Sequence, residues 1–283
     1  MRKQLLRKSS VNIISGESPL TVSRAVFLRT SDIYRVISCS RPPLRQAVGN
    51  FFVDISGRVK YNVYGQRFLC ILVFSEVVMD IRILHHDKDI VVCIKPVGVS
   101  SENTEKGDGL PDLLSAQLGE KYIATLHRLD VGVGGVMAYA LNQKSAAFLS
   151  REISEGRFDK RYFARVYGTP QEDSGIFEDL LFKDSKKNKS FVVKKQRSGV
   201  KKAKLSYAVL EKNEKTSLVD ILLFTGRSHQ IRVQFSSRNM PLVGDGKYGA
   251  KDNEKNIALM CHCLEFTHPR SGQRMKFDIP CTI

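Results

Sequence analysis

Hydrophobic and polar residues alternate along the chain with two periods, and each period predicts one kind of element. Residues 81–94 predict two short strands around a polar turn. Leucines at helical spacing predict a helix over 109–118, and the pattern over 140–155 predicts a second helix. Alternation predicts a strand over 160–167, and a continuous apolar run predicts a buried strand over 218–224.

The polar cluster inside residues 123–140 is the most informative stretch. An apolar run leads into His-Arg-Leu-Asp at 127–130, three glycines follow, and the chain turns apolar again at Val136. This order predicts a strand, a tight loop and a second buried element, with Asp130 at the mouth of the loop. Glycine in such a loop permits the close approach of another chain or of a ligand.

Two interpretations of Asp130 are open on this pattern. A turn aspartate that bonds its own backbone is the common case. The alternative is an ion-paired acid that serves as a nucleophile or base. Arg128 lies two residues away, on the same face if this segment is a strand, and more arginines follow in the polar segment 226–232.

Composition and charge narrow the class of protein. With 283 residues, 42% of them hydrophobic, the chain can form one large domain, alone or with a small one. A net charge of +16 and a pI near 9.6 favour a polyanionic partner, with nucleic acid ahead of a merely solvated basic surface. No apolar run reaches the roughly 18 residues of a membrane span. No lysine-rich amphipathic helix stands out either, so no membrane partner is expected.

The six cysteines show no framework of a secreted domain, and no Cys-x-x-Cys pair occurs. We expect reduced cysteines and a cytoplasmic protein. Cys261, His262, Cys263 and His268 lie close in sequence, but their spacing fits no common structural zinc site. Alternation on a strand would also turn His262 away from both cysteines, so we expect no metal.

Residues 183–204 are the most basic stretch of the chain. The apolar runs at 191–193 and 205–210 predict the two strands of a hairpin, and a helix is predicted over 228–236. Lysines in the basic stretch are expected to contact phosphate groups, which positions a nucleic acid without reading its sequence. These candidate residues are Lys186, Lys187, Lys194, Lys195, Lys201 and Lys202.

Six segments, in order along residues 79–280, resemble the signature sequences of the RluA-type RNA pseudouridine synthases. They are 90–98, 127–130 with Gly135, 160–166, 226–232, 241–249 and 264–269. Six ordered segments are far more specific than any single motif. The chain departs from the family pattern at Ile94, at 133–134 and at 259–261, which leaves open which subgroup, and so which RNA, is involved.

The resemblance implies an α+β fold with a large mixed, mainly antiparallel β-sheet and flanking helices. It implies an isomerase that converts specific uridines into pseudouridine in structured ribosomal or transfer RNA, without cofactor or metal. We also expect a monomer. The alternative is a non-catalytic RNA-binding or ribosome-assembly factor that retains the fold. Such a factor would tolerate the loss of Asp130 or Tyr162, and both are present.

The same resemblance implies a role for each of five residues. Asp130 would be the nucleophile, attacking either the sugar or the uracil ring, and Arg227 would pair with it. Tyr162 would stack on the target base and assist the removal of its proton afterwards. Arg128 would fill the gap left by the flipped base or hold a phosphate, and Leu259 would supply an apolar wall.

Residues 1–78 differ in composition from the remainder, residues 79–283. The first segment carries nine Arg and three Lys against two Asp and two Glu, whereas lysine dominates the second. We expect the catalytic domain to span 79–283. Three interpretations of residues 1–78 are open: an over-extended gene start, which we favour, an organellar transit segment, or a degenerate form of the S4-type RNA-binding region that family members often carry.

Overall fold

The chain divides into two compact units, Met1–Met79 and Asp80–Ile283. The computed structural model describes residues 80–283 except residue 106, and within 1–79 it describes the backbone of six strands. None of the described residues belongs to a helix long and apolar enough to cross a membrane.

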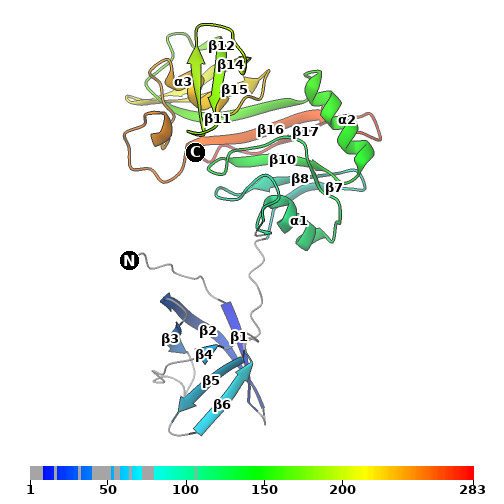
Figure 1. Cartoon of the computed structure of the whole chain (residues 1–283), viewed down its shortest axis with the longest axis vertical. Helices are drawn as coiled ribbons and strands as arrows, with labels where there is room; N and C mark the ends of the chain where they lie inside the picture. The colour runs from blue at the N-terminus through cyan, green and yellow to red at the C-terminus, as the bar shows by residue number, and fades with distance from the viewer. Residues whose placement is uncertain are drawn as a thin grey trace. The chain divides into compact units, whose positions relative to one another are not determined.

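The strands of the first unit form two antiparallel sheets of three strands each (Figure 1). They are β1 (Ser9–Ser15), β2 (Ser18–Thr30), β3 (Ile33–Cys39), β4 (Phe52–Val53), β5 (Arg58–Val63) and β6 (Gln66–Ile71). The predicted domain boundary between residues 78 and 79 lies outside the described residues. All three interpretations of the first segment stay predictions.

The second unit is built on one sheet of eleven strands, in the order β13-β12-β14-β15-β11-β16-β10-β8-β7, with β9 on β10 and β17 on β16 (Figure 1). The strands are β7 (Ile83–His86), β8 (Ile90–Lys95), β9 (Ala124–Thr125), β10 (Gly134–Ala140), β11 (Asp159–Tyr167), β12 (Ser174–Asp184), β13 (Lys189–Val193), β14 (Val200–Lys212), β15 (Thr216–Leu223), β16 (Leu259–Thr267) and β17 (Arg274–Asp278).

This sheet confirms the predicted mixed, mainly antiparallel architecture. Strands β10 and β16 pair in parallel at its centre, and the other strand pairs described in it are antiparallel. Gly135 makes the parallel pairing possible, because a Cβ atom there would lie 2.1 Å from the backbone oxygen of Cys261. Its φ of +126° is also closed to most other residues. The glycine after the polar cluster is therefore required by the close approach of two strands.

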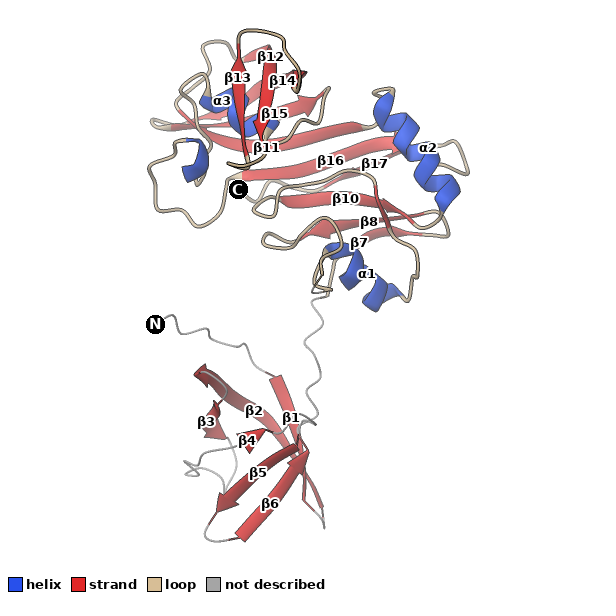
Figure 2. Cartoon of the chain, in the orientation of Figure 1, coloured by secondary structure: helices blue, strands red, loops and turns tan. Residues whose placement is uncertain are grey.

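Three helices flank the sheet, namely α1 (Leu110–Leu118), α2 (Gln143–Ser154) and α3 (Gln230–Ser236) (Figure 2). The second helix begins three residues later than the pattern predicts. Ala140 still belongs to β10, and the side chain of Asn142 caps the helix by accepting a 2.9 Å hydrogen bond from the amide of Ser145.

The predicted hairpin between 191–193 and 205–210 is wrong. Strand β13 pairs with β12, and β14 pairs with the other edge of β12, so β12 separates the two predicted partners. Asn188 turns the chain between β12 and β13 with a φ of +45°. The polar and glycine residues within β12 hide its alternation in the sequence.

A chain that begins at Met79 should fold and convert RNA as well as the full-length protein does. The reason is that residues 80–283 form a compact unit with a buried core of their own, which runs from Ile81 to Phe266 as described. Thermal unfolding and RNA conversion of both chains check this. Aggregation of the shorter chain, or loss of its activity, would show that residues 1–78 belong to the working enzyme.

Candidate active site

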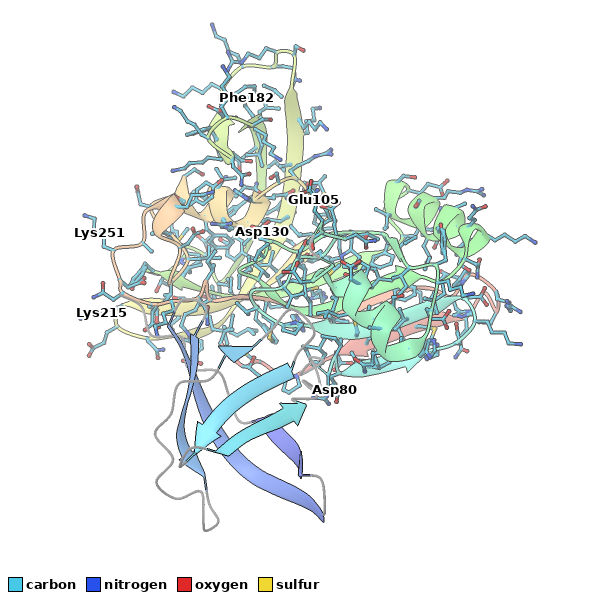
Figure 3. All side chains as sticks on the ribbon, turned by 60° about the horizontal axis from the view of Figure 1, so that its bottom comes forward. Asp80, Glu105, Asp130, Phe182, Lys215 and Lys251 are labelled. Carbon is cyan, nitrogen blue, oxygen red and sulfur yellow. The ribbon has the colours of Figure 1, made fainter. Side chains whose placement is uncertain are left out.

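A groove with a volume of about 1080 Å³ contains the polar cluster of the sequence. It is lined by the loop between β9 and β10, by the start of β11, by the turn from β15 to α3 and by the turn end of the β12–β13 hairpin. Asp130 lies in the middle of the unit in Figure 3, between these elements. Such a groove is larger than one nucleobase requires.

The backbone on both sides of Asp130 is fixed by hydrogen bonds. The hydroxyl of Ser101 accepts from the amide of Leu129 at 3.0 Å and donates to its carbonyl at 2.8 Å. On the other side, the amide of Gly98 donates to the carbonyl of Val131 at 2.7 Å. The loop therefore holds Asp130 in place through its neighbours and leaves its side chain available.

Lys95 is a buried cation beneath this loop, with 1% of its surface exposed. Its ammonium donates to the carbonyls of Val99 at 2.7 Å, Pro96 at 3.0 Å and Val131 at 3.4 Å. Burial lowers the pKa of Lys95 to about 8, although the nearby charge of Asp130 opposes the shift. The sequence places Lys95 in a turn and gives no sign that its charge lies beneath Asp130.

Arg232 binds the carboxylate of Asp130. Its Nη1 donates to Oδ2 of Asp130 at 2.7 Å, and its Nε and Nη2 donate to the two oxygens of Asp245 at 2.7 and 2.8 Å. The side chains of Arg232 and Asp245 are 7% and 1% exposed, whereas that of Asp130 is 32% exposed. Oδ1 of Asp130 accepts no hydrogen bond within residues 80–283 as described. The carboxylate is thus held by one oxygen and open at the other.

The predicted pairing of Arg227 with Asp130 is wrong. Arg227 is exposed, and its Nε donates to the carbonyl of Lys202 at 2.9 Å. Its amide donates to the side chain of Gln230 at 3.0 Å, which fixes it in the turn before α3. Arg232 instead lies in the first turn of α3, and the helix directs it towards Asp130.

Arg128 and Asp130 do not share the face of a strand, because β9 ends at Thr125 and both lie in the loop that follows. Arg128 lines the groove, and its side chain is 55% exposed. Its Nη1 forms a 3.0 Å ion pair with Glu102. An exposed pair of this kind contributes little stability and can be exchanged for another anion.

Tyr162 and Leu259 supply the apolar side of the groove. Both line it, from the neighbouring strands β11 and β16, and are 5% and 6% exposed. Burial raises the pKa of Tyr162 well above its usual value, which keeps the phenol protonated near neutral pH.

Two histidines line the groove as hydrogen-bonding groups. Nδ1 of His229 lies 2.9 Å from the hydroxyl of Tyr248, and its Nε2 lies 3.8 Å from Asp130. Nε2 of His127 accepts from the amide of Ala138 at 3.3 Å. Burial lowers the pKa of both rings, to about 3 for His127, so they are neutral at pH 7.

The predicted phosphate-contacting lysines are all exposed, but none of them lines the groove. Lys201 and Lys202 lie on strand β14, and the other four lie in the turns on either side of β13. Different lysines line the groove, and the sequence analysis did not select them: Lys160, Lys183 and Lys247.

One group of side chains has the composition of a metal site. His85, Asp87 and His268 place their ligand atoms within 4.8 Å of one another. However, Nδ1 of His268 accepts from two backbone amides, so its Nε2 must carry the proton and donate to Asp87 at 2.9 Å. The group therefore ties two turns together and does not fit a metal ion. Nε2 of His262 shares a 3.0 Å hydrogen bond with Oδ1 of Asp220, so this nitrogen is engaged with a carboxylate and not with Cys261 or Cys263.

The comparisons agree with the geometry. A family model described as RNA pseudouridylate synthase matches residues 89–237. An uncharacterized RNA pseudouridine synthase of Mycobacterium bovis is 32% identical over 214 residues, covering 70% of this chain and 68% of that protein. Ribosomal large subunit pseudouridine synthase D of Borreliella burgdorferi is 32% identical over 194 residues, covering 64% and 59%. The solved structure of human RNA pseudouridylate synthase domain containing 1 has the same fold, with a TM-score of 0.62 at 24% identity over 72% of this chain and 84% of that one.

The chain therefore belongs to the RNA pseudouridylate synthase family, as the sequence motifs predict. Its enzyme class is RNA pseudouridine synthase, an isomerase that acts on RNA.

Proposed function

We propose that this protein converts uridine into pseudouridine in structured ribosomal or transfer RNA, with Asp130 as the nucleophile. The observation that supports the proposal is the chain of charges from Asp245 through Arg232 to Asp130. Asp245 is buried and fixes the guanidinium of Arg232, which in turn holds one oxygen of Asp130. The other oxygen accepts no hydrogen bond from residues 80–283 as described, so it can attack the substrate.

The reaction requires three changes at one nucleotide. The N1–C1′ bond breaks, the uracil ring turns, and a C5–C1′ bond forms. C5 then loses its proton and N1 gains one, so that product and substrate are isomers. Asp130 can assist by adding to C1′ of the ribose or to C6 of the uracil.

The base has to leave its stack before it can enter the groove. Tyr162 and Leu259 offer a buried apolar wall against which a uracil ring can lie. Arg128 at the exposed rim can exchange Glu102 for a phosphate, or fill the space that the flipped base leaves.

Mapping pseudouridine in cellular RNA with and without the gene tests the proposal and identifies the substrate. Ribosomal RNA is the first place to examine, because similar proteins are named ribosomal large subunit pseudouridine synthases C and D. We expect one or a few uridines to lose the modification on deletion. An unchanged map would contradict the proposal. A cytoplasmic monomer remains our expectation for the protein itself.

Reversing the charge of four of the predicted phosphate-contacting lysines should weaken RNA binding and flatten its dependence on salt. Suitable positions are Lys186, Lys187, Lys194 and Lys195, which are exposed outside the groove. Each lost phosphate contact reduces the salt slope by roughly 0.7 to 0.9. Turnover of bound RNA should change little, because these cations are remote from the reacting atoms. RNA binding across a salt series decides this, and an unchanged slope would place the RNA elsewhere.

A further inference from the structure

Lys160 is a cation at one end of the groove that lacks a strong partner. It lies at the start of β11, two residues before Tyr162, and both side chains line the groove. The hydrogen bond that its ammonium donates within the described part of the chain, to the carbonyl of Phe158, is 3.5 Å long. Burial lowers the pKa of Lys160, as expected for a charge with little compensation.

The other cations of the groove are satisfied in ways that Lys160 is not. Arg128 and Arg232 form ion pairs with carboxylates. Arg227 and Lys247 donate to backbone carbonyls, and Lys183 is exposed to water. Because a half-buried ammonium with one weak hydrogen bond is costly, Lys160 is the groove cation with the most to gain from a bound anion.

A second unsatisfied donor lies near Lys160. Because Nε2 of His127 accepts from a backbone amide, its Nδ1 carries the ring proton, and this atom is buried without an acceptor among residues 80–283 as described. The ring of Phe158 contacts both groups: its centroid is 5.5 Å from that of His127 and 5.4 Å from the ammonium of Lys160. Nδ1 of His127 is closed to solvent, so Lys160 is the donor at this ring that an acceptor from outside the protein can reach.

We propose that Lys160 holds a phosphate oxygen of the RNA strand beside the target nucleotide. This inference rests on the proposed function, because it takes RNA as the occupant of the groove. A phosphate fits better than a base carbonyl, since only an anion compensates the charge of a half-buried ammonium. The site is close to the chemistry, because two residues along a strand span about 7 Å.

Binding of a short oligouridylate to the full-length chain, across a salt series, tests the site. The variants are Lys160→Met, which keeps the stem and removes the charge, and Lys160→Arg, which keeps the charge. Lys215→Met is the matched control, because Lys215 is exposed and far from Asp130 in Figure 3. We expect Lys160→Met to bind roughly ten- to a hundredfold more weakly, with a salt slope shallower by about 0.7. Lys160→Arg and Lys215→Met should keep the slope of the parent protein.

A footprint on the unmodified protein covers the case in which Lys160→Met does not fold. Reductive methylation of Lys160, read by mass spectrometry, should be blocked by the oligouridylate and not by the nucleoside uridine. Equal protection by uridine would mean a base contact and overturn the inference, as would an unchanged salt slope in Lys160→Met. Neither measurement requires conversion of uridine. A failure of Asp130 as the nucleophile would therefore leave this result intact, and the reverse also holds.

Discussion

Replacing Arg232 by alanine should abolish detectable conversion and destabilise the protein by about 3–5 kcal/mol. The change leaves Asp245, whose side chain is 1% exposed, as a buried carboxylate without its cation. It also frees Asp130 from its one strong hydrogen bond. Arg232→Lys should recover part of the stability but little activity, because an ammonium cannot bind Asp245 with two parallel bonds and reach Asp130 as well. Thermal or denaturant unfolding beside conversion of RNA measures both effects.

Two further variants show whether the buried charge is the cause. Adding Asp245→Asn to Arg232→Ala should restore part of the lost stability, because it removes the unpaired carboxylate. Arg227→Ala should unfold like the parent protein, since the exposed side chain of Arg227 donates to one carbonyl only. A parent-like stability for Arg232→Ala would mean that the Asp245–Arg232 pair contributes nothing.

Asp130→Asn should reduce conversion by roughly 10⁴-fold or more while leaving RNA affinity unchanged or slightly higher. Asparagine keeps the size of the side chain but lacks the nucleophilic oxygen and the negative charge. The hydrogen bonds that fix the loop involve Leu129 and Val131, so the loop should stay in place. A turn aspartate would tolerate the change, but the side chain of Asp130 bonds Arg232 rather than its own backbone.

Glu102→Gln is the matched control for this variant. It removes the same charge from a carboxylate that also lines the groove, at a position paired with Arg128. Conversion by Glu102→Gln should stay close to that of the parent protein. An equal loss in both variants would mean that the overall charge of the groove matters rather than the nucleophile.

The sequence predicts those parts of the fold that leave a local pattern of apolar, polar and glycine residues. The motif glycine at 135 indicates a close approach of chains, and the structure shows β16 as the neighbour that requires it. Strand β12 could not be read from alternation, because glycine and acidic residues interrupt its apolar face. Missing that strand produced the wrong hairpin, since β13 and β14 appeared adjacent along the chain.

The candidate site, too, is predicted from the sequence only in part. The resemblance brings Asp130, Tyr162 and Leu259 to one groove, and the structure places all three there. It does not distinguish Arg227 from Arg232, because the choice depends on where α3 begins. His229 precedes that helix with a φ of +54°, a backbone conformation that the sequence does not reveal. Which arginine pairs with Asp130 thus depends on the three-dimensional structure, and Asp245 is recognisable as the residue that fixes Arg232 only once the chain is folded.

The most direct test of the account is made in cells that carry Asp130→Asn as their only copy of the gene. The measurement is the pseudouridine content at each uridine that loses the modification when the gene is deleted, with equal amounts of parent and variant protein. If Asp130 is the nucleophile, these positions remain uridine in the variant, as in the deletion. Pseudouridine at the parent level would contradict this role, because RNA conversion would then proceed without the carboxylate of Asp130.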